Sequence, residues 1–227
     1  MPLYKFGPIS SKLSQPISST TTSQFAQLLS NPAEMAKYSL VFFLLSTLCV
    51  AGITNFASAA AASNLIKSSC STTKYPALCV QSLSKYANTI QNPQQLAQTA
   101  LSVSLDRAVS TKTFVTRLTK FKGLKAREHE AVKDCLDEVS DSVDRLTRSI
   151  QELKQCSSAK GQDFTWHISN VETWVSSALT DDTTCVDEFA GKALNGKIKG
   201  SIRPRMVNVG QVTSNALSLI NKYASEH

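Results

Sequence analysis

The sequence predicts an all-α protein: an up-down-up-down four-helix bundle that follows a small N-terminal helical hairpin and carries two disulfides. The chain of 227 residues contains 8 Gly and 7 Pro, a composition that favours helices. Four long segments repeat apolar residues at alternating steps of three and four, which places those residues on one helix face. The links between these segments are short, and short links make neighbouring helices antiparallel.

The hairpin is predicted over residues 60–92, as an appendage ahead of the bundle. Pro76 turns the chain, and apolar residues lie on both sides of it. They are Leu65, Ile66, Leu78, Val80 and Leu83. The bundle then occupies residues 93–227. Its first helix is expected from about Gln94 to Phe121, where the apolar repeat is less strict.

The three later helices have a stricter repeat. The second is marked by Val132, Leu136, Val139, Val143, Leu146, Ile150 and Leu153. In the third, Asp182 interrupts the register of Phe164, Ile168, Val171, Val175, Ala178, Cys185 and Phe189. The fourth follows Ile202, Met206, Val209, Thr213, Ala216, Ile220 and Tyr223. Breaks are expected at Gly123, at residues 157–161 and at residues 191–200, because each contains glycine, which ends helices.

The N-terminal region predicts export. Residues 35–59 combine a positive charge at Lys37, an apolar core from Leu40 to Ile53 and small residues around Ala57-Ser58-Ala59, which are the three parts of a secretory signal peptide cleaved after about residue 59. The apolar run is shorter than the ~20 residues of a membrane span. Residues 1–34 are rich in Ser and Thr and are either a disordered leader or sequence upstream of the true translation start. We therefore expect a secreted, extracellular protein with no membrane segment in its mature form.

Cys49 lies in the predicted signal peptide and is removed with it, which leaves five cysteines. Export allows these five to pair, since the compartment is oxidising. Cys70 and Cys79 flank the Pro76 turn, which suits a short-loop bridge. Cys135 and Cys185 fall at the same end of an antiparallel bundle and are the second candidate pair. Cys156 lies about 21 residues or ~30 Å along its helix from Cys135. It is the predicted free thiol of an expected monomer, and the residue through which a dimer would form.

Charge is distributed unevenly along a chain of net charge +7. Seven Lys/Arg and no acid lie between Arg107 and Arg127, whereas fourteen Asp/Glu and five Lys/Arg lie between Glu128 and Glu188. The acidic stretch would repel a phosphate backbone, which argues against nucleic-acid binding. No set of residues has the spacing of a metal site or of a catalytic nucleophile with its base, so neither a cofactor nor an enzyme activity is expected.

Several motifs, taken in order, resemble the plant invertase and pectin methylesterase inhibitor family from about Asn64 to Ala224. The first motif is the cysteine pair Cys70 and Cys79, in which Cys79 ends the block Tyr75-Pro76-Ala77-Leu78-Cys79. Two further blocks are Lys133-Asp134-Cys135-Leu136 and Asp141-Ser142-Val143-Asp144. The last motif is the run from Val171 to Asp181 that leads to Thr184-Cys185. The resemblance implies a four-helix bundle with an N-terminal hairpin, bridges Cys70–Cys79 and Cys135–Cys185, and no enzyme activity.

Within that family, Gly123-Leu124-Lys125-Ala126-Arg127-Glu128 resembles the pectin methylesterase inhibitor branch. The Pro-Lys-Phe motif of invertase inhibitors is absent, because a threonine precedes Lys120-Phe121. The implied function is to block the pectin-binding cleft of pectin methylesterase in a one-to-one complex, with acid invertase as the alternative target. The resemblance also implies that Asp137, Asp141 and Thr184 contact the partner, although amphipathicity alone makes the two carboxylates a solvated helix face.

Overall fold

The computed structural model describes residues 39, 41, 43, 60–190 and 196–227. The chain divides into two compact units, Met1–Thr54 and Asn55–His227, and the second contains every helix discussed below. The predicted leader over residues 1–34 lies outside the described residues, as does the predicted signal peptide over 35–59 apart from residues 39, 41 and 43. None of the helices among the described residues is long and apolar enough to cross a membrane.

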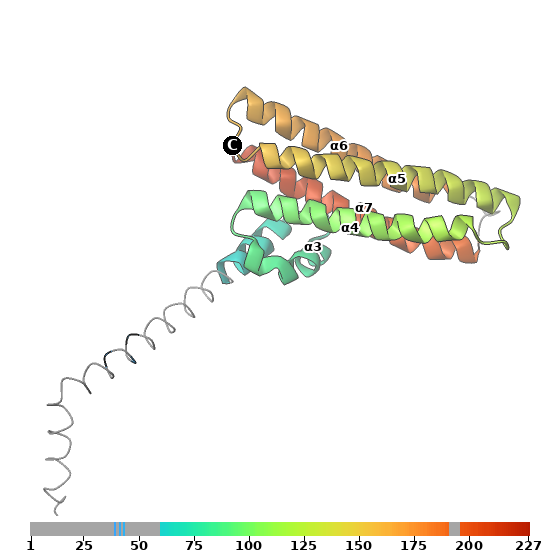
Figure 1. Ribbon diagram of the computed structural model, residues 1–227, viewed down its shortest axis with the longest axis horizontal. Coiled ribbons are helices and arrows are strands. Elements are labelled where there is room, and N and C mark those ends of the chain that lie inside the picture. Colours follow the sequence, from blue (N-terminus) through green and yellow to red (C-terminus); the bar gives the residue numbers. More distant parts are fainter. Residues whose placement is uncertain (1–38, 40, 42, 44–59, 191–195) are drawn as a thin grey trace, which may run out of the picture. The chain divides into compact units, whose positions relative to one another are not determined.

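Four long antiparallel helices form the bundle (Figure 1). They are α4 (Pro93–Thr119), α5 (Ala126–Gln155), α6 (Gln162–Glu188) and α7 (Lys197–Ser225). α5 packs against α6 and α4 against α7, and the pairs α4–α5 and α6–α7 complete the four sides. The predicted all-α, up-down-up-down fold is confirmed.

Local capping explains where several of these helices begin. The side chain of Asn92 accepts a hydrogen bond from the backbone N–H of Gln95 at 2.8 Å, and Pro93 occupies the first turn of α4, where its missing N–H has no partner to lose. Glu128 accepts from the backbone N–H of Lys125 at 3.0 Å at the start of α5. Gly161, with a φ of 56°, precedes α6 and adopts this conformation without a steric penalty.

The apolar repeats form the core of the bundle. In α6 and α7, every residue that the repeats marked is buried, and Asp182 is buried among them with 1% of its surface exposed. In α5, Val132, Val139, Leu146 and Leu153 are fully buried, and the other residues of the repeat, Leu136, Val143 and Ile150, are half-buried. The residue that interrupts the register of α6 is therefore still a core residue.

The N-terminal hairpin packs on the bundle core more closely than an appendage would. It consists of a helix over residues 60–70, α3 (Pro76–Leu83) and the 3₁₀ helix η1 (Ser84–Thr89). The buried side chains of Ile66 and Leu83 belong to the same apolar cluster as those of α4 and α7. The amide of Asn215 on α7 exchanges two hydrogen bonds of 3.0 Å with the backbone N–H and C=O of Tyr75. These contacts correct the expectation of an appendage.

The start of the last helix also differs from expectation. The sequence predicted a break over residues 191–200 and a repeat that begins at Ile202, but α7 begins at Lys197 and includes Gly200. Pro204 lies inside this helix. Pro204 lies beyond the second turn of α7, where a proline removes one backbone hydrogen bond and crowds the preceding turn. Packing of the apolar face outweighs this cost and the poor helix propensity of these residues.

Within residues 60–190 and 196–227, two disulfides are present and one cysteine is free. Cys70–Cys79 joins the helix over residues 60–70 to α3, and Cys135–Cys185 joins α5 to α6. Cys156 is unpaired and only 3% exposed, and burial raises the pKa of its thiol to about 11. A buried, protonated thiol is a poor nucleophile, so a bridge between two chains would require the end of α5 to open.

Candidate partner-binding face

The long helices divide by charge into two pairs. We call α5 and α6 the acidic pair, since together they carry fourteen Asp/Glu and five Lys/Arg. We call α4 and α7 the basic pair, since they carry eight Lys/Arg and one acid, Asp106. Because each pair packs as neighbours, the sequence's two-sided charge becomes two sides of one bundle.

A disulfide fixes one end of the acidic pair. The Cα atoms of Cys135 and Cys185 are 4.3 Å apart. Asp137 lies two residues after the first cysteine on α5, and Thr184 lies one residue before the second on α6. The bridge therefore holds the parts of α5 and α6 that carry these two predicted partner contacts close together.

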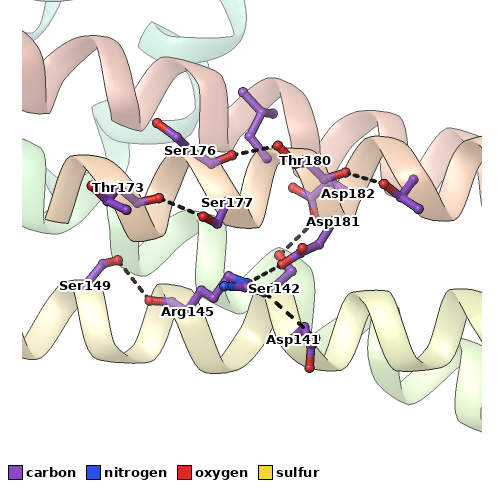
Figure 2. Close-up of polar contacts among 12 residues, drawn as sticks. Asp141, Ser142, Arg145, Ser149, Thr173, Ser176, Ser177, Thr180, Asp181 and Asp182 are labelled. Atoms are coloured by element: carbon purple, nitrogen blue, oxygen red, sulfur yellow. Dashed lines mark hydrogen bonds and ion pairs between the residues drawn. The ribbon is translucent and has the colours of Figure 1, made fainter. Parts of the chain in front are cut away.

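An arginine links the two helices in the middle of the acidic pair (Figure 2). Nε of Arg145 donates to Oδ2 of Asp181 at 2.8 Å, and its Nη2 lies 3.9 Å from Oδ2 of Asp141. Burial raises the pKa of Asp181 despite the opposing effect of Arg145. Burial also raises the pKa of Glu138, and the carboxylates of Asp181, Asp141 and Glu188 add to that shift. These acids share one side of the α5–α6 contact.

Asp182 is a buried carboxyl group beside this ion pair. The hydroxyl of Ser142 on α5 donates to its Oδ1 at 2.9 Å, as Figure 2 shows. The hydroxyl of Thr213 on α7 lies close enough to Asp182 to lower its pKa, although it and Oδ2 of Asp182 do not form a hydrogen bond of good geometry. Burial raises the pKa of Asp182 to about 7, because removal from water disfavours the charged form.

A third link lies toward the other end of the acidic pair. Oε1 of Glu152 on α5 lies 2.8 Å from Nδ1 of His167 and accepts from Nδ2 of Asn170 at 2.9 Å, both on α6. Burial opposes ionisation of Glu152, but these two partners outweigh it and lower its pKa. We call Glu152, His167 and Asn170 the Glu152 cluster. A disulfide, an ion pair and the Glu152 cluster therefore hold α5 and α6 in one geometry.

The predicted partner contacts all lie on the acidic pair. Asp137 and Asp141 are exposed on α5, and the side chain of Asp141 is 65% exposed. Thr184 is half-buried, and its hydroxyl donates to the backbone C=O of Thr180 at 3.0 Å. The structure links Asp141 to α6 through Arg145. It gives Asp137 no such link.

Sequence reasoning did not identify Arg145 and Asp181 as part of this face. The sequence did contain a signal for the neighbouring residue Asp182. This acid occupies a position of the apolar repeat, and Ser142 belongs to the family-like block Asp141-Ser142-Val143-Asp144.

Within residues 60–190 and 196–227, no group of three or more His, Cys, Asp or Glu side chains is arranged to hold a metal ion.

Known proteins resemble this chain over most of its length. Residues 64–219 match the family model "Plant invertase/pectin methylesterase inhibitor". The chain is 57% identical over 195 residues to the 21 kDa protein of Daucus carota, covering 86% of this chain and 98% of that protein. It is 50% identical over 201 residues to pectinesterase inhibitor 11 of Arabidopsis thaliana, covering 86% of this chain and all of that protein.

A solved structure shows the same fold. It is a mutant form of a pectin methylesterase inhibitor from Arabidopsis, with a TM-score of 0.56 and 24% identity, and the match covers 67% of this chain and 92% of that one. The family match extends over more than half of the sequence, and both relatives are aligned almost from end to end. The chain therefore belongs to the plant invertase/pectin methylesterase inhibitor family, which is a family of inhibitors rather than of enzymes.

Proposed function

We propose that this protein inhibits a pectin methylesterase. The observation that carries the proposal is the 50% identity to pectinesterase inhibitor 11, which the chain matches over that protein's full length. The sequence supports the same target over acid invertase, because it has the Gly123–Glu128 block and lacks the proline before Lys120-Phe121.

The acidic pair is the proposed contact surface. A rigid face loses little conformational freedom on binding, and α5 and α6 are joined at three places. We place Asp137, Asp141 and Thr184 in the contact, where the bundle lies across the pectin-binding cleft in a one-to-one complex and excludes the substrate. This mechanism needs no reacting group on the inhibitor.

An inhibition titration tests the proposal. Purified residues 60–227 are added in increasing amounts to a pectin methylesterase and, separately, to an acid invertase. We expect the esterase to lose its activity at one inhibitor per enzyme and the invertase to retain its activity. Inhibition of the invertase alone would replace the target, and inhibition of neither would leave a binding protein that does not inhibit.

Affinity should depend on pH if carboxylates of the acidic pair lie against the enzyme, since a partner shifts their pKa values and links binding to protons. We hypothesise tighter binding at pH 5 than at pH 8. Asp137→Asn mimics the protonated form at one position and should change the affinity at pH 8. Equal dissociation constants at the two pH values, or a variant indistinguishable from the original protein, would contradict the hypothesis.

We also propose that the mature protein is secreted and begins after about residue 59, with residues 35–59 as its signal peptide and residues 60–92 and 93–227 as its hairpin and bundle. The pattern of Lys37, an apolar core and small residues supports export. Expression from Met35 in plant cells, followed by N-terminal sequencing of the extracellular protein, tests this proposal. Retention inside the cell, or a mature protein that still carries the apolar core, would contradict it.

A further inference from the structure

The basic pair carries a charge pattern that inhibition through the acidic pair leaves without a role. α7 has five Lys/Arg and no acid, and α4 adds three Lys/Arg and one Asp. Charge of one sign concentrated on one side of a small protein attracts a partner of the opposite sign. The partner of the basic pair should therefore be an anion.

Two adjoining clefts lie on this side of the bundle. One, of about 590 Å³, lies where α3 and η1 meet α4 and is lined by Lys85, Tyr86 and Arg107 among others. The other, of about 380 Å³, lies between α4 and α7 and includes Ser201 and Arg205. The two clefts share Arg107, Ser110 and Asn208. They therefore form one continuous groove, which suits an extended chain better than a compact small molecule.

The groove is lined by groups that bind carboxylates and sugar hydroxyls. Lys85, Arg107 and Arg205 supply positive charge, and Asp106 is the one acid among the residues that line it in the described structure. Cζ of Arg205 lies 4.1 Å from the ring centroid of Phe114, which orients the guanidinium. Arginine binds a carboxylate through two parallel hydrogen bonds, and the hydroxyl of Ser110 and the amide of Asn208 suit neutral sugar oxygens.

We propose that this groove binds a linear polyuronate, the carboxylate-bearing polysaccharide that remains when methyl esters are removed from pectin. The inference rests on the proposed function, because hydrolysis of pectin methyl esters by the target enzyme produces this anion. A single-stranded nucleic acid fits less well, because its bases stack on aromatic side chains and Tyr86 is the one aromatic residue among those that line the groove in the described structure. The acidic pair would then hold the enzyme while the basic pair holds the de-esterified polymer.

Binding of the polymer to residues 60–227 alone, without any esterase, tests the groove. Oligomers of polygalacturonate and of fully methyl-esterified polygalacturonate, matched in length, are titrated into the protein at low and at physiological salt. We expect the de-esterified oligomer to bind, the esterified one not to bind, and the affinity to fall as salt increases. Equal affinity for the two oligomers, or no binding of either, would overturn the proposal.

Two double variants distinguish binding in the groove from general attraction by the protein's positive charge. Arg107→Gln with Arg205→Gln removes one groove arginine from α4 and one from α7. Arg117→Gln with Arg203→Gln removes one exposed arginine from each of the same helices but none that lines either cleft. We expect about a tenfold or greater loss of affinity in the first pair, the effect of two lost charged hydrogen bonds, and a loss of about twofold in the second, the effect of general charge.

Equal losses in the two double variants would overturn the proposal, as would tighter binding of single-stranded DNA or of anionic lipid vesicles than of polygalacturonate. Lys85→Gln, at the other end of the groove, checks the result independently and should also weaken binding. Inhibition of pectin methylesterase is measured on the same variants and should be unchanged. A protein that binds the polymer but inhibits no esterase would refute the proposed function and leave the groove intact.

Discussion

The two helix pairs of this bundle are held together by different kinds of contact. Between α5 and α6 lie a disulfide, the Arg145–Asp181 ion pair and the Glu152 cluster. Between α4 and α7 lie apolar side chains such as Val103 and Val212. Hydrogen bonds and disulfides fix the relative orientation of two helices, because they need particular distances and angles. Apolar burial is non-directional, so it tolerates small shifts of one helix against the other. The acidic pair is therefore built to keep one geometry, as a surface that must match a partner enzyme requires.

The largest expected effect on this difference between the helix pairs comes from removing one disulfide at a time. Replacing Cys135 and Cys185 with serine opens a loop of 50 residues and should lower the free energy of unfolding by about 4 kcal/mol. Replacing Cys70 and Cys79, whose loop spans 9 residues, should cost about 2 to 3 kcal/mol. Guanidinium unfolding without reductant measures both.

Inhibition assays on the same two variants extend the comparison. Loss of Cys135–Cys185 should weaken inhibition, because it frees the part of the acidic pair near Asp137 and Thr184. Loss of Cys70–Cys79 should leave inhibition in place while the protein is folded, because that bridge lies in the hairpin. The reverse order of effects would contradict the assignment of the contact surface to α5 and α6.

The second test concerns Asp182, whose pKa is raised to about 7 by burial. Between about pH 4 and pH 7 the folded protein keeps a proton that the unfolded chain has lost, so stability is greatest at low pH and falls as pH rises through this window. The loss should be on the order of 4 kcal/mol. Asp182→Asn should flatten the curve of Tm against pH, and an unchanged slope in the variant would show that other groups control it.

The third test removes the cation of the acidic pair. Arg145→Met leaves Asp181, whose side chain is only 10% exposed, without its positive partner. Stability should fall by about 2 kcal/mol, because a buried charge then lacks compensation. Arg148→Met, at an exposed position on the same helix, should change stability by less than about 0.5 kcal/mol. Similar effects of the two substitutions in urea unfolding would mean that the ion pair does not hold the helices together.

The smallest expected effect comes from an arginine of the basic pair. Arg205→Met removes the cation that lies over the ring of Phe114, a contact worth about 0.5 to 1 kcal/mol at an exposed position. Urea unfolding of this variant and of Arg145→Met compares the basic pair with the acidic pair, because the same Arg→Met substitution is made in each. A larger loss at Arg205 than at Arg145 would reverse the proposed difference between the pairs.

The sequence predicted the helices well, because apolar residues repeated at helical spacing must share a face and bury it. It predicted the start of α7 less well, since Gly200 and Pro204 signal a break that packing overrides. The tie between Asn215 and Tyr75 joins residues 140 positions apart, and no local pattern indicates such a contact. For this reason the hairpin was expected as an appendage.

The acidic pair shows a similar limit. Periodicity placed Asp141 on the outer face of α5 and Asp182 in the core register of α6, and the structure agrees. It could not show that Arg145 reaches Asp181 or that Ser142 reaches Asp182. Those pairs depend on how α5 and α6 are rotated against one another, which the repeat within one helix does not determine. The roles of Asp137, Asp141 and Thr184 stay predictions.

A matched pair of substitutions tests the central claim, that the acidic pair is the surface that binds the esterase. Thr184→Arg places a bulky side chain on α6, and Thr113→Arg places the same side chain on α4; in each case the threonine hydroxyl donates to the backbone C=O four residues earlier. The inhibition constant against pectin methylesterase is measured for both. We predict about a tenfold or greater loss for Thr184→Arg and none for Thr113→Arg. Full inhibition by Thr184→Arg together with a loss in Thr113→Arg would contradict the account.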